Sequence, residues 1–434
     1  MSRIRSIATA ATSFGMAIVL CSLFGLSAAQ AVDRSALSPR TQIVGGFWDG
    51  VRPLLDVQNP ADQPEFYEAP EGVDVSALAP GTVLRERTFK YYVATMETSL
   101  DVTQLLYVTT SALGVLETNV TSVIHPPQGT DGSIVAYQSF YDTSNPVDNP
   151  SRSIAGNLSL GGLIPALENV FILPALLAGH SVVVADTQGK DANFAAGPAY
   201  GAATLDSLRA ATAATTTEIK PDSNIGLFGY SGGAIASNWA AIRAREYAPE
   251  IEQRLIGVAQ GGLMVNPINN LDYASDGLVW SGVVGLALSS LGDTYQVDIS
   301  QYLNEYGLAA YADTRNLSII EAQYRYPSLK WTDIAKPEYP NLNEIPELKK
   351  IIDTLNMGAW DSPKIPMFIF QGAGGEKEGT PVHPEVGMGD GIMVTKDVRT
   401  LAREPVSRRG RSQQLQYDPR GKHVVIWQRA VALK

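Results

Sequence analysis

The hydrophobic residues of this chain form short uniform runs that alternate with longer stretches of helical spacing. The uniform runs lie at 181–186, 224–228, 256–260 and 366–371. Runs this short, bounded by turn residues, are typical of strands buried on both faces of a parallel sheet. Stretches 197–214 and 231–247 carry apolar residues at helical spacing. The alternation predicts an α/β fold with a mostly parallel central sheet and helices on both faces.

The part of the chain ahead of this alternation has weaker patterns. Residues 32–81 are rich in Pro, Asp and Glu, and we expect them to form an arm over the surface. Strands, the first three of them antiparallel, are predicted at 88–94, 111–115, 119–125 and 133–138. Stretch 163–177 predicts a helix before the first of the uniform runs.

The alternation stops after residue 262 and resumes near residue 363. We expect the residues between them to form a helical cap, inserted before the last strands. Beyond the cap, the pattern predicts a helix at 396–403, a final strand at 413–417 and a last helix that begins near His423. The expected parts of the chain are a core of 32–262 and 363–434 and a cap of 263–362.

The first 31 residues have the pattern of a secretory signal peptide. Arg3 and Arg5 form a basic start, 14–26 is apolar but too short for a comfortable membrane span, and 29–31 fits an A-x-A cleavage site. The prediction is a secreted protein without a membrane span after cleavage. Cys21, the only cysteine, lies within this segment, so we expect no disulfide and no thiol chemistry in the mature chain.

The formal net charge of the chain is −11 at pH 7. An acidic exported chain is a poor candidate for binding nucleic acid or anionic membranes, because both carry negative charge. The charge is interpreted as a source of solubility, and the sequence gives no indication of the oligomeric state.

Residues 229–233 read Gly-Tyr-Ser-Gly-Gly, which fits the G-x-S-x-G nucleophile elbow of serine hydrolases. In that turn a strand passes into a helix, and the serine hydroxyl is raised above the end of the strand. Glycines two residues before and after the serine allow strand and helix to come close. The pattern is common by chance, but here a predicted strand precedes it and a predicted helix follows. We therefore expect Ser231 to be a nucleophile.

A serine nucleophile needs a base and an acid that orients the base. In hydrolases of this layout the order along the chain is Ser, then Asp or Glu, then His. Two of the four histidines, His125 and His180, precede Ser231 and are interpreted as structural. His423 follows the predicted final strand and is the expected base. His383, in a loop rich in Gly and Pro, is the alternative.

The acid should follow the strand at 366–371. Asp390 lies just ahead of the helix that leads to the predicted final strand, and it is the favoured acid. Glu376 and Glu378 come directly after the earlier strand and stay open as alternatives. Asp397 falls within the predicted helix and is a weaker candidate.

Acyl transfer to a serine also needs two hydrogen-bond donors where negative charge develops. The backbone N–H of Gly232, directly after the nucleophile, is the first expected donor. The second should come from the loop after an earlier strand, and Asp142, beyond the strand at 133–138, is the candidate through its backbone. From the local sequence alone, Asp142 is equally well interpreted as a turn-forming residue.

Taken together, these residues resemble the secretory lipase family of the yeast lipase A type. The resemblance rests on 229–233, 247–250, Tyr137 and Gln138 with Asp142, 184–189, 259–262, 390–394 and His423. It extends from about residue 66 to the end of the chain, and it implies a secreted α/β hydrolase that acts on carboxylic esters. It assigns catalysis to Ser231, Asp390 and His423, and the oxyanion hole to Asp142 and Gly232.

The expected function is that of a triacylglycerol lipase that forms an acyl-enzyme on Ser231 and needs no metal or other cofactor. The expected partner is a lipid or another acyl ester. In the cap, the apolar run 278–291 would line an acyl-chain pocket or form the cap's own core, and both interpretations stay open. A short-chain esterase and an extracellular acyltransferase fit the same triad. A non-catalytic secreted binding protein with a hydrolase fold is the alternative from another class.

Overall fold

The structure, a computed structural model, describes residues 35–403, 411–417 and 424–430. The predicted signal peptide 1–31, which contains Cys21, lies outside the described residues, and so does the predicted base His423. Within the described residues, no helix is both long enough and apolar enough to cross a bilayer.

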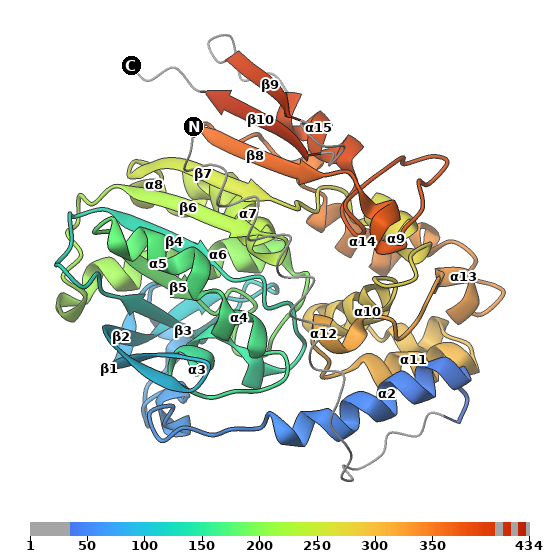
Figure 1. Ribbon diagram of the computed structural model, residues 1–434, viewed down its shortest axis with the longest axis horizontal. Helices are drawn as coiled ribbons and strands as arrows, with labels where there is room; N and C mark the ends of the chain where they lie inside the picture. The colour runs from blue at the N-terminus through green and yellow to red at the C-terminus, as the bar shows by residue number, and fades with distance from the viewer. Residues whose placement is uncertain (1–34, 404–410, 418–423, 431–434) are drawn as a thin grey trace.

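Ten strands of the described part form one sheet, in the order β1-β2-β3-β5-β4-β6-β7-β8-β10-β9 (Figure 1). The strands are β1 Val83–Val93, β2 Met96–Thr110, β3 Leu116–Ile124, β4 Ile134–Gln138, β5 Ser181–Ala185, β6 Ile225–Tyr230, β7 Leu255–Gly261, β8 Met367–Gly372, β9 Arg411–Tyr417 and β10 Val424–Ala430. The five strands from β5 to β8 in this order run parallel. Antiparallel pairs extend the sheet on both sides of them. The predicted α/β fold with a parallel centre is confirmed.

The first strands differ from the prediction. Residues 111–115, predicted as a strand, form the turn between β2 and β3, in which the N–H of Ser111 donates to the carbonyl of Val115 at 2.8 Å. Gly114 supplies the positive φ of 76° that this turn needs. The long strand β2 is missed by the apolar pattern, because its first six residues are largely exposed and mostly polar.

Helices cover the sheet on two faces. They are α3 Pro150–Ile154, α4 Leu163–Leu167, α5 Asn169–Leu177, α6 Gly197–Ala213, α7 Gly232–Tyr247, α8 Pro249–Glu252 and, near the end, α15 Thr395–Arg403, whereas α2 Pro39–Val51 lies elsewhere. Val183 of β5 packs in one buried cluster with α6 and α7. Its neighbours Val182 and Val184 pack in another cluster with α5. Because successive side chains of a strand point to opposite faces, α5 lies across the sheet from α6 and α7. The single helix predicted at 163–177 is in fact divided into two short helices, α4 and α5.

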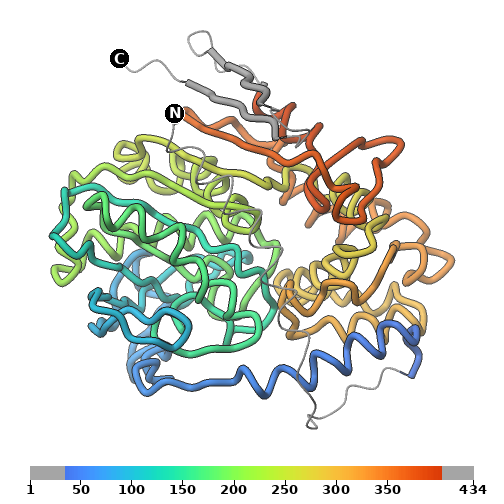
Figure 2. Tube along the Cα trace, in the orientation of Figure 1, coloured from blue at the N-terminus to red at the C-terminus, as the bar shows by residue number. Residues whose placement is uncertain are grey.

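Between β7 and β8 the chain forms a helical insertion. Its helices are α9 Pro267–Ser275, α10 Gly282–Tyr295, α11 Glu305–Thr314, α12 Ile319–Ala322, α13 Trp331–Ile334 and α14 Pro346–Leu355. In Figure 1 the arrows of the parallel strands point toward this insertion. Figure 2, in the same orientation, shows it as the yellow to orange part of the chain. Much of the insertion has its own buried core, which includes Tyr302, Leu303 and Trp331.

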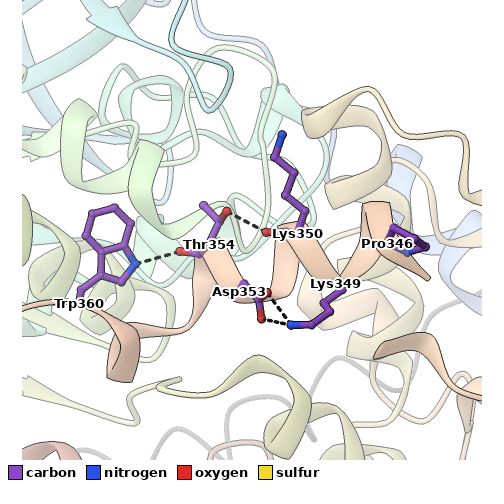
Figure 3. A pocket seen from close by; sticks show the side chains of 6 residues that line it. All are labelled: Pro346, Lys349, Lys350, Asp353, Thr354 and Trp360. Carbon is purple, nitrogen blue, oxygen red and sulfur yellow. Dashed lines mark hydrogen bonds and ion pairs between the residues drawn. The ribbon is translucent and has the colours of Figure 1, made fainter. Parts of the chain in front are cut away.

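A surface hollow of about 510 Å³ runs along α14, between Pro346 and Trp360 (Figure 3). The ion pair between Lys349 and Asp353 lies on its wall, and the indole N–H of Trp360 donates to the carbonyl of Thr354 at 3.3 Å. None of the predicted site residues lines this hollow.

The end of the described chain corrects one prediction. The segment after position 423 was expected to be a helix, but 424–430 forms β10, which pairs antiparallel with both β8 and β9. The sequence Val-Val-Ile-Trp at 424–427 explains the difference, because β-branched and aromatic residues favour strands over helices. Strand β9 and helix α15 lie close to their predicted positions.

The expected N-terminal arm contains the unpredicted helix α2, which begins at Pro39 after an N-cap from Ser38. This helix lies along the insertion (Figure 1). The hydroxyl of Thr41 donates to the carbonyl of Arg325 at 2.7 Å. Directly after the helix, Arg52 forms an ion pair with the buried Glu321. The arm thus docks on the helical insertion.

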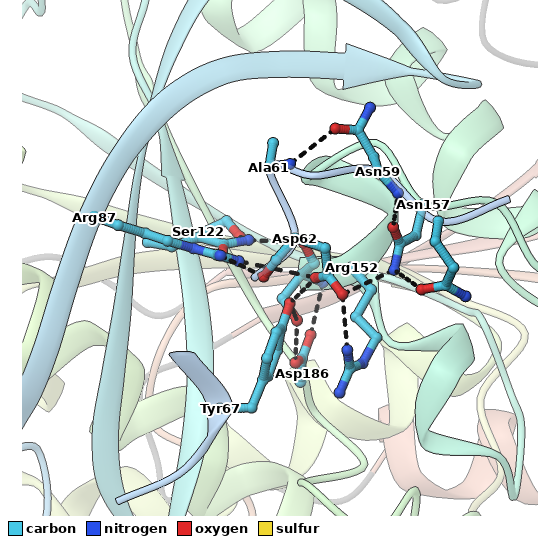
Figure 4. A network of polar contacts seen from close by, with 12 residues as sticks. Asn59, Ala61, Asp62, Tyr67, Arg87, Ser122, Arg152, Asn157 and Asp186 are labelled. Carbon is cyan, nitrogen blue, oxygen red and sulfur yellow. Dashed lines mark hydrogen bonds and ion pairs between the residues drawn. The ribbon is translucent and has the colours of Figure 1, made fainter. Parts of the chain in front are cut away.

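Beyond α2, the arm is fixed to the core by a buried polar network around Asp62 (Figure 4). The carboxylate of Asp62 accepts hydrogen bonds from Tyr67 at 2.7 Å and from Arg152 and Asn157 at 2.8 Å each. Nearby, Asp186 at the end of β5 accepts from the backbone and hydroxyl of Ser151. Since buried carboxylates are costly unless they are hydrogen-bonded, this network specifies how the arm meets the sheet.

Candidate active site

Ser231 lies in the turn between β6 and α7, as the elbow pattern predicts. Its φ of 52° and ψ of −120° lie in a strained region that is rare for residues other than glycine. Added Cβ atoms would collide with the carbonyl of Gly233 if placed at Gly229, and with the carbonyl of Gln138 if placed at Gly233. The two glycines therefore allow the close approach of strand, helix and neighbouring strand that holds the turn in this conformation.

The turn is also tied to the next strand. The N–H of Ser231 donates to the carbonyl of Gly261 at the end of β7, at 2.8 Å. The ring of Tyr230 stacks on that of Phe370 in β8, with 6.0 Å between the ring centroids. The position of the serine is thus defined by three adjacent parallel strands.

Asp142 is placed beside the elbow by the loop after β4. An added Cβ at Gly232 would overlap the Oδ1 atom of Asp142, and the N–H of Gly232 is hydrogen-bonded to the same carboxyl group. Gln188 donates to this oxygen at 3.3 Å. Burial raises the pKa of Asp142 to about 8, and the hydrogen bond from Gly232 only partly offsets this effect. At pH 7 the carboxyl is therefore mostly neutral.

Both the core and the insertion hold the loop that carries Asp142. Glu168, between α4 and α5, accepts a hydrogen bond from the N–H of Phe140 at 2.9 Å. The carbonyl of Asp142 accepts from the N–H of Ile319, the first residue of α12, at 2.8 Å. The N–H of Ser144 donates to the carbonyl of Leu317 at 2.8 Å. The insertion is therefore bonded directly to this loop.

Glu168 is a residue that the sequence argument missed. It is 1% exposed, and burial raises its pKa to about 7. The signal that points to it is its position as the only charged residue within the apolar stretch 163–177. A lone carboxyl inside an apolar stretch needs a buried partner, which here is the loop beside the elbow.

Asp390 lies against the carboxyl end of β8. Its Oδ1 atom accepts from the backbone N–H groups of Ile392 at 3.1 Å and Met393 at 2.8 Å, and its Oδ2 atom accepts from the amide of Gln371 at 2.8 Å. Burial raises the pKa of Asp390 to about 6, while these three hydrogen bonds act in the opposite direction. Near neutral pH the group is therefore mostly ionised in a preformed cradle of donors.

The alternative acids have other surroundings. Glu378 is exposed and accepts a hydrogen bond from the indole of Trp280 at 2.9 Å. Glu376, which lies with Glu378 in the short 3₁₀ helix Gly375–Glu378, is also exposed. Asp397, on α15, accepts both of its hydrogen bonds from the amide of Asn269.

The three described histidines are engaged away from the elbow. His125 contacts the hydroxyl of Thr103 at 2.9 Å, and His180 pairs with Asp131 at 3.0 Å. The Nδ1 atom of His383 accepts from the backbone of Glu385 and Val386, and its Nε2 atom lies 4.0 Å from Asp276. These contacts belong to turns and surface ion pairs.

The predicted base His423 lies outside the described residues, but its neighbour in the sequence is placed. Val424, the first residue of β10, pairs with Gly372, the last residue of β8. An added Cβ at Gly372 would stand 2.8 Å from the Cβ of Asp390. The chain thus enters β10 next to the residue of β8 that contacts Asp390.

The structure therefore brings Ser231, Gly232 and Asp142 into one group and puts Asp390 at the same edge of the sheet, two strands away. The negative charge of Asp390 contributes, after burial, to the raised pKa of Tyr230, the residue before the nucleophile. Among the described residues, no group of three or more His, Cys, Asp or Glu side chains is arranged to hold a metal ion.

Sequence comparisons place the chain among lipases. The sequence profile of the family described as "Secretory lipase" matches residues 156–376. Lipase 6 of Candida albicans is 31% identical over 326 residues, which cover 72% of this chain and 70% of that lipase. A Mycobacterium tuberculosis protein named "Probable inactive lipase MT1628" is 29% identical over 74% of this chain and 71% of its own length.

A comparison with solved structures agrees. The structure of Candida antarctica lipase A in its closed state matches with a TM-score of 0.62 and 26% sequence identity, over 72% of this chain and 74% of that one. The family profile, Lipase 6 and the lipase A structure all point to lipases, which are carboxylic ester hydrolases. The chain belongs to the secretory lipase family.

Proposed function

We propose that this protein is a secreted triacylglycerol lipase that cleaves its substrate through an acyl-enzyme on Ser231. The observation that carries the proposal is the strained elbow at Ser231, with the carboxyl group of Asp142 directly beside the next N–H group. A positive φ at a serine is stable only when its surroundings enforce it, and such strain is concentrated at functional sites. Family membership makes ester hydrolysis the reaction that this serine would perform.

The proposed triad is Ser231, His423 and Asp390. The base takes the proton of the serine hydroxyl as its oxygen attacks the ester carbonyl, and it then gives that proton to the leaving alcohol. In the second half of the reaction it activates the water that releases the fatty acid. The assignment of His423 is supported by the pairing of Val424 with Gly372, which brings the chain beside Asp390. The donor cradle of Asp390 supports its assignment over Glu376 and Glu378, which are exposed.

The proposed oxyanion hole consists of Gly232 and Asp142. The backbone N–H groups of Gly232 and Asp142 would donate to the developing oxyanion. Because the raised pKa keeps Asp142 mostly neutral at pH 7, the carboxyl does not repel that negative charge. As an acid it has an O–H group, which is a further donor beside the backbone.

We propose that residues 263–362 act as a cap and that the acyl chain lies where the cap meets the oxyanion loop. Val283 and Leu286 of α10 pack in one buried apolar cluster with Tyr141, next to Asp142, and with Ile319 of α12. Leu288 and Leu291 of α10 pack against the insertion's own core. The apolar run of the sequence would thus serve both interpretations, the pocket wall and the core of the cap.

The function is tested with purified protein on emulsified triacylglycerol and on a soluble short-chain ester, with Ser231→Ala as the matched variant. We expect hydrolysis by the wild type, none by the variant, and labelling of Ser231 by a fluorophosphonate in the wild type alone. Equal rates for the two proteins would exclude the serine mechanism. A folded wild-type protein that neither hydrolyses ester nor reacts with the probe would support the non-catalytic alternative.

The same preparation distinguishes the remaining alternatives. Activity on soluble esters without activity on the emulsion would assign the protein to the short-chain esterases. Transfer of the acyl group to an added alcohol in preference to water would assign it to the acyltransferases. Secretion through the signal peptide 1–31 is tested by N-terminal sequencing of the exported protein, which we expect to begin near Val32.

A further inference from the structure

We propose that Gln371 is a positioning residue that fixes the carboxylate of Asp390 in its catalytic orientation and links it to the nucleophile elbow. The inference rests on the proposed function, in which Asp390 is the acid of the triad. Gln371 lies in β8 and is 0% exposed.

Both ends of the Gln371 amide are engaged. Its Nε2 atom donates to Oδ2 of Asp390 at 2.8 Å and to the carbonyl of Gly372 at 3.3 Å. Its Oε1 atom accepts from the N–H of Leu263, beyond β7, at 3.1 Å. Because the amide is held on one side by Leu263, it can donate to Asp390 in one orientation only.

These contacts determine which oxygen of Asp390 is available to a base. Oδ1 already accepts two backbone hydrogen bonds, from Ile392 and Met393. Oδ2 accepts one described side-chain bond, from Gln371, and a carboxylate oxygen has a second acceptor site. Gln371 thereby holds Oδ2 so that its remaining site is free for an imidazole N–H.

The amide also connects the acid to the serine. Leu263, which Gln371 accepts from, stands two residues after Gly261, whose carbonyl accepts the N–H of Ser231 at 2.8 Å. Three hydrogen bonds and a short piece of backbone therefore join the carboxylate to the elbow. Displacement of reacting groups by about 1 Å can cost about 10²-fold in rate, so this link bears on turnover.

A purely structural glutamine and a positioning glutamine differ in the titration of the active site. The amide of Gln371 stabilises the ionised form of Asp390 and so lowers its pKa. Without the amide, the pKa of Asp390 would rise. Since catalysis needs the ionised acid, the acidic limb of the pH profile would move to higher pH.

The test compares Gln371→Met and Gln371→Glu with Gln260→Met in the full-length enzyme, on a soluble ester. Gln260 is a matched control, because it is also a 0% exposed glutamine at the end of a parallel strand, but its amide donates to Asn238 at 2.8 Å and not to the acid. For Gln371→Met we expect kcat to fall about tenfold or more and KM to change less than about twofold. We also expect the midpoint of the acidic limb in the pH profile of kcat/KM to move to higher pH by about half a unit or more. For Gln260→Met we expect a smaller loss of kcat and an unmoved limb.

Gln371→Glu keeps the shape of the side chain and guards against a variant that fails to fold. It adds a second carboxyl beside Asp390, and we expect an even larger upward shift of the acidic limb. The inference is overturned if the Gln371 variants keep the wild-type kcat and pH profile, or change them only as much as Gln260→Met does. If Ser231→Ala or Asp390→Asn retains full activity, the proposed triad fails instead.

Discussion

Gly232 and Asp142 are in such close contact that the glycine leaves no room for a Cβ atom against the carboxyl group. Gly232→Ala should therefore displace Asp142 from the elbow and lower kcat by about 10²- to 10³-fold, the usual loss when an oxyanion donor is removed. Steady-state kinetics on a soluble ester measure this effect. Gly226→Ala is the control, because an added Cβ in that part of β6 would meet no atom within 4 Å. Full activity of Gly232→Ala would remove this residue from the oxyanion hole.

The raised pKa of Asp142 predicts a loss of activity at alkaline pH. As the pH rises through about 8, the carboxyl becomes ionised and places negative charge where the oxyanion must form. We expect kcat/KM to fall over this range in the wild type, and the fall to be absent in Asp142→Asn, whose side chain carries no charge. A pH–rate profile of both proteins on a soluble ester checks the prediction. An unchanged alkaline limb in the variant would assign the limb to another group.

Asp142→Asn should also change the dependence of stability on pH. In the unfolded chain the carboxyl has its ordinary pKa of about 4, whereas burial raises this pKa to about 8 in the folded state. Between these two pH values the unfolded state releases the proton and the folded state keeps it, so the folded wild type loses stability as the pH rises. We expect the variant to gain Tm relative to the wild type as the pH rises from 4 to 8. Thermal unfolding at three pH values measures the difference, and a constant difference would contradict the assigned pKa.

Glu168 should affect turnover without touching the substrate. Glu168→Leu removes the acceptor of the Phe140 N–H and loosens the loop that carries Asp142, so we expect kcat to fall about tenfold or more. Glu168→Gln keeps a carbonyl acceptor in the same place and should retain most of the activity. Equal losses in both variants would indicate that the charge of Glu168, and not its hydrogen bond, is what matters.

The stability of the insertion depends on the ion pair between Arg325 and Asp313, both of which are 0% exposed as side chains. Arg325→Met removes the guanidinium from a buried carboxylate and should cost about 3–5 kcal/mol of unfolding free energy. The control is Lys349→Met, which breaks the largely exposed pair with Asp353 and should cost less than about 1 kcal/mol. Denaturant unfolding of the two variants compares them. Similar losses would mean that the buried pair contributes no more to stability than the exposed one.

Much of the fold could be read from the sequence because its central elements have strong local signals. The uniform apolar runs became β5, β6, β7 and β8, and the glycines around Ser231 predicted the elbow. Local patterns failed where the surroundings decide. The exposed first half of β2 has no apolar run, and 424–430 becomes a strand because β8 and β9 are there to pair with it.

The candidate site was only partly accessible from the sequence for a similar reason. Chain order and turn chemistry were enough to propose Ser231, Asp390 and Asp142. Gln371 and Glu168 support these residues through contacts between positions far apart in the chain, and no spacing rule predicts such contacts. The assignment of His423 stays a prediction from chain order.

A short segment of the N-terminal arm connects the insertion to the core, and its length limits how far the two could separate. Arg52 bonds to Glu321 of the insertion, whereas Val57 pairs with Leu158 of the core. The five residue steps between Arg52 and Val57 can span at most about 17 Å when fully extended. This segment therefore acts as a short tether between Glu321 and Leu158. Any displacement of the insertion that carries Glu321 farther than this segment can reach would have to break the Arg52–Glu321 pair or the Val57–Leu158 pairing.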